Sequence, residues 1–431
     1  MTYAEAVGRL LALRGGELQG MRPGLERIEA LLAAIGNPER RFDLVQVGGT
    51  NGKGSVSALL AACLEAAGRR VGLYTSPHLV EFSERIRVNG QPIAPSDVVD
   101  GVEALGTLVA RLDATMFEAT TALALDHFAQ AGVEVAVLEV GLGGRLDSTT
   151  VGRPVAEILA RIDLDHQRYL GDTLAAIAAE KAAIIRSGVA LSARQAPEAE
   201  AVVLRRAAEA GVPLLLEGRD LSVSVRRFSL EAQHLDLAGP GFRLEDARCR
   251  LIGVYQPGNA LLAAAAAHRL GVPERAILAG LATAEWPGRF QILRREPLLL
   301  LDGAHNPAGA RALADSLRAY FPGQPVTLVL GISADKDHAG ILGALCPVAT
   351  RLILTGFAHP RAARPAALLE AVPPGGPAPE VAASPAEALA MAQDDPATPM
   401  VCVAGSLFLI GEVLAQVPEK LTNLGAREGR C

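Results

Sequence analysis

The chain has 431 residues with a formal net charge of −6, and half of its residues are hydrophobic. This length predicts two domains with sizeable cores, and the acidic balance excludes an extended basic surface for nucleic acid. Aromatic residues make up only 4% of the chain, which also excludes a platform for stacking bases. We therefore expect no nucleic-acid partner.

The five cysteines are scattered along the chain, a distribution typical of reduced thiols rather than of a disulfide framework or a zinc site. The N-terminal stretch has no basic segment followed by an apolar one, so no signal peptide is expected. The longest alanine-rich run, residues 260–268, is too short to span a bilayer. We expect a cytoplasmic protein that acts as a monomer and has no membrane partner.

Short apolar runs alternate with helical patterns along most of the chain, which predicts parallel sheets covered by helices. In the first part, the predicted strands are residues 44–47, 71–75, 133–140, 155–162 and 189–192. The helical patterns between them are residues 56–67, 120–131 and 173–187. A second alternation has predicted strands at residues 298–301, 326–330, 351–354 and 400–403.

A glycine-rich run from Gly48 to Ser55 follows the first predicted strand and precedes a helical pattern. In this setting backbone N–H groups can surround phosphate oxygens, and the helix N-terminus adds partial positive charge. Lys53 would reach the outer phosphates. The spacing departs from the strict P-loop pattern, because Gly48 lies one residue too close to Gly52 and Gly54 separates the lysine from Ser55. An ordinary turn is the alternative, but the lysine and the flanking elements favour nucleotide binding.

The segment of residues 285–290 contains a Pro-Gly pair that ends a helix. We place the domain boundary just after this segment, so the domains are residues 1–293 and 294–431. The predicted fold class is α/β, with a P-loop-type parallel-sheet ATPase domain followed by a smaller Rossmann-like α/β domain. The Pro/Gly-rich stretch 372–379 is predicted to be a surface loop inside the second domain, because strand and helix signals resume beyond it.

Polar residues follow several predicted strands, where ligands bind in open parallel sheets. Glu139 resembles a metal-organising carboxylate, with a helix cap or turn acid as the alternative. Ser76 could offer a hydroxyl to a cation, although Ser before Pro is common in turns. His166 lies beside acids after the strand 155–162, and it is either a ligand or a structural histidine. Because magnesium prefers oxygen ligands, a histidine ligand indicates tolerance of Mn²⁺.

From its spacing alone, Lys181 is interpreted as a solvated surface lysine. In the second domain, Asp302 and His305 follow the strand 298–301. Asn306 and Pro307 then predict the cap and first turn of a helix. A strand-to-helix turn without function is the alternative for this run, and the concentration of polar groups favours a functional role.

Taken together, these runs resemble the folylpolyglutamate synthase/dihydrofolate synthase family within the Mur ligase superfamily. The resemblance extends from Leu25 to Phe408. It implies that residues 1–293 form a Mur-ligase-like ATP-binding domain and that residues 294–431 form a glutamate ligase domain. The matching runs are residues 49–55, 75–79, 84–90, 139–147, 165–166, 170–173, 180–182, 287–289 and 302–307.

The resemblance implies a ligase that uses ATP to add L-glutamate to dihydropteroate, to the γ-carboxylate of a reduced folate, or to both, through an acyl phosphate. Two Mg²⁺ ions are the implied cofactors, with Mn²⁺ or K⁺ as alternatives. A cell-wall peptide ligase is disfavoured because the pterin-site segments match the folate branch. A nucleotide switch is a further alternative, but residues 334–337 do not supply the Asn-Lys-x-Asp that reads guanine.

The resemblance also implies roles for individual residues, including a carbamate on Lys181, which would turn a cation into an anion that can organise a metal. The implied catalytic residues are Lys53, Glu139, His166, Lys181 and His305. The implied ATP-binding residues are Thr50, Asn51, Gly52, Lys53, Gly54, Ser55, Asn259, Arg289 and Asp302. The implied metal ligands are Ser76, Glu139 and His166. The implied residues for the pterin-bearing substrate are Arg22, Pro23, Gly24, Leu25, Thr115, Met116, Phe117, Glu118, Leu146, Asp147 and Ser148.

Three positions depart from the usual family pattern. Ala183 follows the lysine where Gly is common, the run Ser148-Thr149-Thr150 stands where Ala-Thr-Asn is frequent, and Tyr255 stands where His is frequent. These departures concern details of pterin recognition and adenine contacts rather than the phosphate loop.

Overall fold

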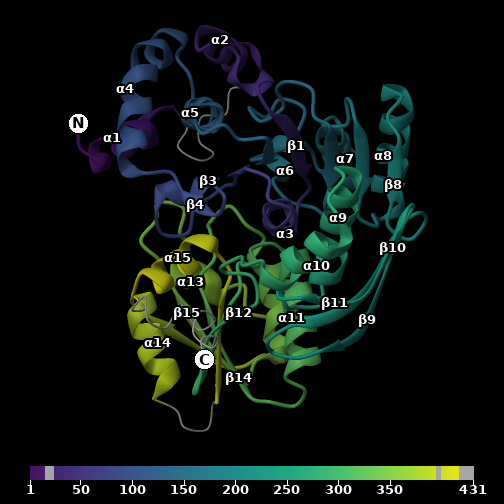
Figure 1. Ribbon diagram of the computed structural model, residues 1–431. Helices are drawn as coiled ribbons and strands as arrows, with labels where there is room; N and C mark the ends of the chain where they lie inside the picture. The colour runs from purple at the N-terminus through teal and green to yellow at the C-terminus, as the bar shows by residue number, and fades with distance from the viewer. Residues whose placement is uncertain (15–23, 395–398, 417–431) are drawn as a thin grey trace, which may run out of the picture. The chain divides into compact units, whose positions relative to one another are not determined.

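The computed structural model describes residues 1–14, 24–394 and 399–416, which fall into two compact units (Figure 1). The first unit comprises residues 1–227, 233–250 and 256–285, and the second comprises residues 228–232, 251–255 and the chain from residue 286 onward. The boundary predicted at residue 293 falls inside strand β12 (Gln291–Arg295). Because β12 pairs with β13 (Leu298–Leu301), its residues group with the second unit.

The first unit is built on an eight-stranded sheet with the strand order β4-β3-β2-β5-β1-β6-β7-β8. The pairs from β2 through β8 are parallel, which confirms the predicted α/β class, whereas β2–β3 and β3–β4 are antiparallel. In sheet order the strands are β4 (Gln91–Pro92), β3 (Ile86–Val88), β2 (Val71–Tyr74), β5 (Val135–Glu139), β1 (Asp43–Gly48), β6 (Ala156–Leu159), β7 (Val189–Ser192) and β8 (Leu214–Leu216).

The central strands are mostly apolar because the sheet is covered on both faces. In β1 every residue after Asp43 is buried, as expected for a parallel strand between two helical layers. In Figure 1, α1, α4 and α5 lie together near the N-terminus, and these helices share one hydrophobic core with α2. The four helices are α1 (Tyr3–Ala12), α2 (Glu26–Ala34), α4 (Pro95–Leu112) and α5 (Met116–Gln130).

Helix α3 follows β1 and is buried along most of its length, because it packs against α9 and α10. Helices α7 and α8 form a second core with β6 and β7. The remaining helical segments of this unit are η1 (Pro38–Arg40), α3 (Lys53–Ala66), η2 (Phe82–Arg85), α6 (Gln167–Leu170), α7 (Leu174–Ala182), α8 (Pro197–Ala210), α9 (Gln256–Arg269) and α10 (Glu274–Thr283).

A three-stranded sheet, in the order β11-β10-β9, was not predicted from the alternating pattern. Its strands run side by side as long teal to green arrows in Figure 1, and β10 pairs with β11 in antiparallel register. Buried residues alternate with more exposed ones along β10 and β11, so neither strand contains a continuous apolar run. The strands are β9 (Ser222–Phe228), β10 (Gln233–Gly239) and β11 (Phe242–Cys249).

The second unit contains a six-stranded sheet in the order β12-β13-β17-β14-β15-β16, parallel except for the β12–β13 pair. The predicted cap is confirmed, because the Asn306 side chain accepts a hydrogen bond from the Gly309 amide and Pro307 is the first residue of α11. The stretch 372–379 contains turns and leads into β16. The remaining elements are α11 (Pro307–Tyr320), β14 (Val326–Leu330), α12 (His338–Leu345), η3 (Cys346–Val348), β15 (Arg351–Thr355), α13 (Pro365–Leu369), β16 (Pro379–Ala382), α14 (Pro385–Gln393), β17 (Met400–Ala404) and α15 (Leu407–Gln416).

Within the described part of the chain, none of the helices combines the length and the apolar character that a membrane span requires.

Candidate active site

The glycine-rich loop lies between β1 and α3, as the sequence predicts. Gly52 precedes the helix with φ of 96°, a backbone conformation that favours glycine. The amides of Thr50 and Asn51 both donate to the Arg161 carbonyl, at 2.8 and 3.2 Å. The loop is therefore fastened to the segment after β6. Because α3 begins at Lys53, its first N–H groups lack acceptors within the helix and are suited to bind phosphate.

Two side chains of the loop have partners nearby. The Thr50 hydroxyl donates to the Asp163 carbonyl at 3.0 Å and accepts from the amide of the same residue at 3.1 Å. The Lys53 amine donates to the Thr50 carbonyl at 3.3 Å. This contact holds a positive charge over the loop, next to the backbone donors that phosphate oxygens require.

A chain of side-chain contacts connects α9 to the loop. The Asn259 amide donates to Gln256 Oε1 at 2.9 Å, and Gln256 Nε2 donates to Ser55 Oγ at 3.2 Å. A Cβ atom at Gly52 would lie 2.5 Å from Asn259 Oδ1. The predicted ATP-binding residue Asn259 therefore packs against the phosphate loop. Sequence reasoning missed the linking residue, Gln256, because its partner Ser55 is 201 residues away.

Ser76 and Glu139 come together because β2 and β5 are neighbouring parallel strands. The Ser76 amide donates to Glu139 Oε2 at 3.2 Å, and the glutamate is buried. Hydroxyl and carboxylate oxygens are ligands that Mg²⁺ prefers, together with retained waters. The pair therefore fits a magnesium site. In the described residues, however, no group of three or more His, Cys, Asp and Glu side chains is arranged to hold a metal ion.

His166 does not follow its strand as closely as predicted. Strand β6 ends at Leu159, where its pairing with β1 and β7 stops. His166 instead precedes the short helix α6 with φ of 52°. Its amide donates to Asp165 Oδ1 at 2.8 Å, and its ring Nε2 lies 3.8 Å from Asp165 Oδ2. These contacts hold the imidazole next to a carboxylate, and its role as a metal ligand stays a prediction.

Lys181 is buried, with 4% of its surface exposed, so the interpretation of this residue as a surface lysine is wrong. Its amine donates to the Gly49 carbonyl at 2.9 Å. On the other side, Gly144 approaches α7 so closely that a Cβ atom there would lie 3.0 Å from the Lys181 carbonyl. The lysine is buried because α7 lies between the segment after β5 and the phosphate loop.

The segment between β5 and β6 carries three predicted substrate residues, Leu146, Asp147 and Ser148. Asp147 is buried and accepts hydrogen bonds from the Leu142 amide at 2.9 Å and from the Thr149 amide and hydroxyl at 3.0 and 2.6 Å. Burial raises the pKa of Asp147. Leu146 is 36% exposed, whereas Ser148 is buried. Asp147 therefore stabilises the conformation of the segment through hydrogen bonds inside it, and the side chain of Leu146 presents an apolar surface to solvent.

The predicted substrate residues 115–118 begin helix α5. Thr115 and Glu118 form a capping box, in which the Glu118 amide donates to the Thr115 hydroxyl at 3.2 Å and Glu118 Oε2 accepts from the Thr115 amide at 2.7 Å. Glu118 also forms an ion pair with Arg27 at 2.9 Å. Met116 is buried. Thr115 and Glu118 thus have structural contacts that account for their presence at the start of this helix.

Phe117 lies over the segment after β5, because a Cβ atom at Gly141 would be 2.6 Å from the tip of its ring. Leu25 immediately precedes α2, and Gly24 before it has φ of 135°. Two further predicted substrate residues lie outside the described residues: Arg22 and Pro23.

In the second unit, Asp302 follows β13 and is buried. Its Oδ2 accepts from the Tyr255 hydroxyl at 2.7 Å and from the Phe290 amide at 2.8 Å, while Oδ1 accepts from the Ala304 amide at 2.8 Å. Burial raises the pKa of Asp302, and burial together with the Asp302 charge raises the pKa of Tyr255 well above its ordinary value. The sequence carried no signal that Tyr255 is the partner of this aspartate.

Arg289 and His305 approach the same turn as Asp302. Arg289 Nη1 donates to the Gly288 carbonyl at 3.1 Å, and a Cβ atom at Gly303 would lie 2.5 Å from that nitrogen. His305 Nδ1 lies 2.8 Å from the Gly303 carbonyl. A carbonyl only accepts, so Nδ1 carries the proton in this contact. The predicted functional residues of the second unit therefore gather around one glycine.

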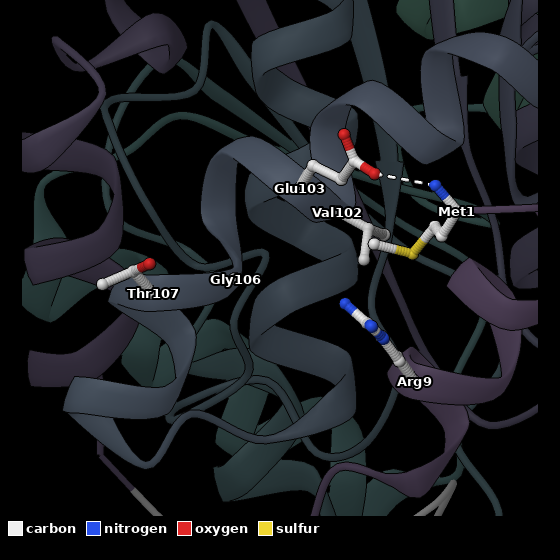
Figure 2. A pocket seen from close by; sticks show the side chains of 6 residues that line it. All are labelled: Met1, Arg9, Val102, Glu103, Gly106 and Thr107. Carbon is white, nitrogen blue, oxygen red and sulfur yellow. Dashed lines mark hydrogen bonds and ion pairs between the residues drawn. The ribbon is translucent and has the colours of Figure 1, made fainter.

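A hollow of about 460 Å³ lies between α1 and α4 (Figure 2). Figure 2 shows the N-terminal ammonium group of Met1 pairing with Glu103, at 2.9 Å. None of the predicted site residues lines this hollow, and most of its wall residues are exposed. We therefore assign it no part in the chemistry of the phosphate loop. The wall residues are Met1, Arg9, Val102, Glu103, Gly106 and Thr107.

Two protein-family models match the chain. Residues 47–267 match the Mur ligase middle domain, and residues 288–407 match the Mur ligase glutamate ligase domain. The first match begins within β1 and includes the phosphate loop, Glu139 and Lys181. The second match includes Arg289, Asp302 and His305.

Individual proteins are similar over nearly the whole chain. Folylpolyglutamate synthase of Lacticaseibacillus casei is 37% identical over 401 residues, covering 90% of this chain and 92% of that protein. Dihydrofolate synthase/folylpolyglutamate synthase of Escherichia coli K12 is 36% identical over 394 residues, covering 91% of this chain and 90% of that protein. The solved structure of Mycobacterium tuberculosis folylpolyglutamate synthase complexed with ADP and AMPPCP has a TM-score of 0.89 and 34% identity, covering 96% of this chain and 99% of that one.

Proposed function

The chain belongs to the folylpolyglutamate synthase/dihydrofolate synthase family of the Mur ligases, and on this premise we propose that it is an ATP-dependent ligase of folate metabolism. It joins L-glutamate to dihydropteroate, which gives dihydrofolate, and to the γ-carboxylate of a reduced folate, which gives the γ-glutamyl-extended form. The observation that carries the proposal is the strand–loop–helix segment in which the Lys53 amine lies over the glycine-rich loop.

The reaction has two steps. An oxygen of the acceptor carboxylate attacks the γ-phosphorus of ATP in line. The bond between the γ-phosphorus and the oxygen that bridges it to the β-phosphate breaks, so that ADP departs and an acyl phosphate is formed. The amine of L-glutamate then attacks the acyl carbon, and inorganic phosphate leaves with the bonding electrons while the amine loses a proton. Catalysis of such a phosphoryl transfer depends mainly on positioning and on electrostatic stabilisation.

The residues of the phosphate loop supply that positioning. Backbone donors at the start of α3, from Gly52 to Ser55, bind the phosphate oxygens, while Thr50 and Asn51, whose amides donate to the Arg161 carbonyl, hold the loop in place beside ATP. Lys53 moves from the Thr50 carbonyl to the charge that develops on the transferred group. Asn259 supports the loop through Gly52 and is proposed to contact ATP as well.

A magnesium site is proposed at Ser76 and Glu139, with His166 as a further ligand. Bound Mg²⁺ neutralises phosphate charge and so lowers the barrier to phosphoryl transfer. The proposal is supported by the position of Ser76, which follows β2 and whose amide lies 3.2 Å from Oε2 of Glu139 at the end of the neighbouring strand β5, since hydroxyl and carboxylate oxygens are ligands that Mg²⁺ prefers. A second ion, and the use of Mn²⁺ or K⁺, are part of the same proposal.

The remaining assignments follow from the family resemblance. Lys181 is proposed to carry a carbamate, supported by its position beside the Gly49 carbonyl. Arg289 and Asp302 are proposed to contact ATP, and His305 to act beside them, supported by their common position around one turn of the second unit. The monomeric state and the cytoplasmic location stay predictions.

The proposal is tested by product formation in two variants. Lys53→Ala and Glu139→Ala should each reduce the rate of glutamate ligation by at least about 100-fold, because the first removes a positive charge that stabilises the transition state and the second removes a proposed ligand of the Mg²⁺ that does so. Circular dichroism and the unfolding midpoint should stay close to those of the parent protein. Glu209→Ala, an exposed glutamate on α8, serves as the matched control. Near-normal turnover in either site variant would refute its role.

Phosphate release separates the proposal from its alternatives. A ligase should release phosphate only when L-glutamate and a pteroate or folate acceptor are both present, whereas a nucleotide switch should require neither. Assaying dihydropteroate and tetrahydrofolate side by side shows which ligase activities the chain has. A product formed only from cell-wall peptide precursors would instead favour another Mur ligase activity.

A further inference from the structure

Gln46 lies at the centre of a buried hydrogen-bond network that the proposed chemistry does not use. Its side chain is 1% exposed and belongs to β1, two residues before the strand ends. Its Nε2 donates to the hydroxyls of Thr149 and Thr150, at 3.1 and 2.7 Å. Its Oε1 accepts from Arg186 Nη2 at 3.3 Å. One side chain thus connects β1 to the segment before β6 and to the segment after α7.

The neighbours of Gln46 require an amide at this position. The Thr149 hydroxyl donates its proton to Asp147 Oδ1 at 2.6 Å, and the Thr150 hydroxyl donates its proton to the Gly144 carbonyl at 2.6 Å. Because a hydroxyl has one proton, both threonine oxygens can only accept from Gln46. The arginine on the other side can only donate. Only a side chain with a donor end and an acceptor end satisfies all three partners.

The network ends in the segment of residues 141–150, which carries the proposed acceptor-binding residues. Within it, the Thr150 amide donates to the Asp147 carbonyl at 2.8 Å. On its far side, the Arg145 amide donates to the Glu180 carbonyl of α7 at 2.9 Å. The segment is therefore held between α7 and β1, and Gln46 provides the contact to β1.

The packing of the sheet does not itself demand this polar network. The flanking residues Val45 and Val47 are apolar and fully buried, as is usual in a parallel strand covered on both faces. An apolar residue at position 46 would meet that packing requirement, although it would cost stability by removing the Gln46 contacts of Arg186 and the two threonines. The amide fixes the position of residues 141–150 relative to β1, the strand that leads into the phosphate loop.

We propose that Gln46 is a positioning residue for the acceptor, holding residues 141–150 in register with the phosphate loop that follows β1. The inference rests on the proposed function and assigns a further residue to the same reaction. Gln46 is buried, and it acts through Thr149, Thr150 and Asp147. Because a shift of about 1 Å in a bound reactant can cost about 100-fold in rate, a loss of this support should be measurable.

The test uses Gln46→Leu and Gln46→Glu in the full chain. Gln46→Glu keeps the size of the side chain but places a second acceptor against two threonine oxygens that have no proton to give. In both variants the KM for the pteroate or folate acceptor should rise about tenfold, which corresponds to about 1.4 kcal/mol, while the KM for ATP changes less than about twofold. The acceptor Kd, measured by titration calorimetry in the absence of ATP, should rise in parallel.

The threonine end of the network provides a second, independent set of variants. Thr150→Val should raise the acceptor KM as Gln46→Leu does, and Thr150→Ser should restore it because the hydroxyl is kept. The double variant Gln46→Leu/Thr150→Val should be no worse than either single variant, because residues that share one contact are not additive. Gln233→Leu is the matched control, because it removes another buried glutamine, in β10 and outside this network.

A merely structural role predicts a different result. If Gln46→Leu and Gln233→Leu lower the unfolding midpoint and kcat to the same degree and leave both KM values unchanged, the inference is overturned. The same holds if Thr150→Ser behaves like Thr150→Val. If the parent protein ligates neither acceptor, the proposed function fails instead, so the two failures are distinguishable.

Discussion

The amine of Lys181 donates to the carbonyl of Gly49 at 2.9 Å, which fixes a lysine of α7 to the start of the phosphate loop. The lysine is buried, and burial of an ammonium group is costly unless it is paired or modified. A carbamate at this nitrogen would replace the cation by an anion within reach of the phosphate loop. The contact places Lys181 beside the phosphate loop, and the carbamate that the family resemblance implies stays a prediction.

Replacement of Lys181 should abolish ligation without unfolding the protein. Lys181→Ala removes the nitrogen, and Lys181→Arg keeps a positive charge but cannot form the lysine carbamate, so both should lose at least about 100-fold in rate. If the carbamate forms, the rate of the parent protein should also fall when bicarbonate and dissolved carbon dioxide are removed. Intact-mass spectrometry should detect the added carbon dioxide. Normal turnover by Lys181→Arg would contradict the assignment.

Gly52 provides a direct test of the contact between the phosphate loop and Asn259. An alanine there would bring Cβ to 2.5 Å from Asn259 Oδ1, at a backbone φ of 96°. We expect Gly52→Ala to raise the KM for ATP at least about tenfold, because the loop or Asn259 must shift. It should also lower stability by about 1 kcal/mol through the positive φ. Steady-state kinetics and urea unfolding measure the two effects.

Gly68 offers the matched control, since it also has a positive φ, 81°, but a Cβ atom there meets nothing within 4 Å. Gly68→Ala should lose similar stability and leave the KM for ATP unchanged. Asn259→Ala alone should also raise the KM for ATP, and in the double variant Gly52→Ala/Asn259→Ala the two losses should be less than additive because the two residues are in contact. Equal KM values for the Gly52→Ala and Gly68→Ala variants would show that the contact with Asn259 does not matter.

The sequence predicted several of the buried strands well, for a physical reason. Strands β7, β13 and β14 have the predicted bounds, because a strand buried on both faces is a continuous apolar run. The phosphate loop was predictable for a similar reason, since strand, glycines, lysine and helix are contiguous in the chain. Local patterns also predicted the Asn306 cap, because its hydrogen bond spans only three residues.

The parts that the sequence did not predict depend on contacts between distant residues. Lys181 was taken for a surface residue because its burial depends on Gly49, which is 132 residues away. Gln46 and its threonines are more than 100 residues apart. The three-stranded sheet of β9, β10 and β11 lacks a continuous apolar run and so resembled ordinary loop sequence. Such contacts exist only once the sheet has brought the segments together.

Variants in the capping box of α5 distinguish a structural role of Thr115 and Glu118 from a role in substrate binding. Thr115→Ala should lower the unfolding free energy by about 1 kcal/mol through loss of the cap, and Thr115→Ser should restore it. Glu118→Ala should cost about 3 kcal/mol, because it removes the ion pair with Arg27 as well as the acceptor of the Thr115 amide. Both losses are measurable by urea unfolding. A rise in the acceptor KM without a loss of stability would instead support substrate contact at these residues.

Glu157 makes the stability of the first unit dependent on pH. It is fully buried in β6 and accepts from the amides of Arg186 and Ser187 at 3.2 and 2.8 Å, while its Oε2 has no hydrogen-bond partner among the described residues. Burial raises its pKa from 4.5 to about 7. Between these two values the folded state binds more protons than the unfolded state, so this group makes stability fall as pH rises. Above pH 7 the carboxylate is ionised in both states, and the full free-energy cost of burying its charge is present.

Glu157→Gln should remove this dependence, because the amide keeps an acceptor for the two backbone donors and has no charge to bury. Relative to the parent protein, the variant should gain unfolding free energy as pH rises from 4.5 to 7, by at most about 3 kcal/mol over that interval. Urea unfolding of both proteins at several pH values between 5 and 8 measures the difference directly. Titrations of all other groups cancel in that difference, so parallel pH curves would mean that Glu157 is ionised throughout this range in the folded protein.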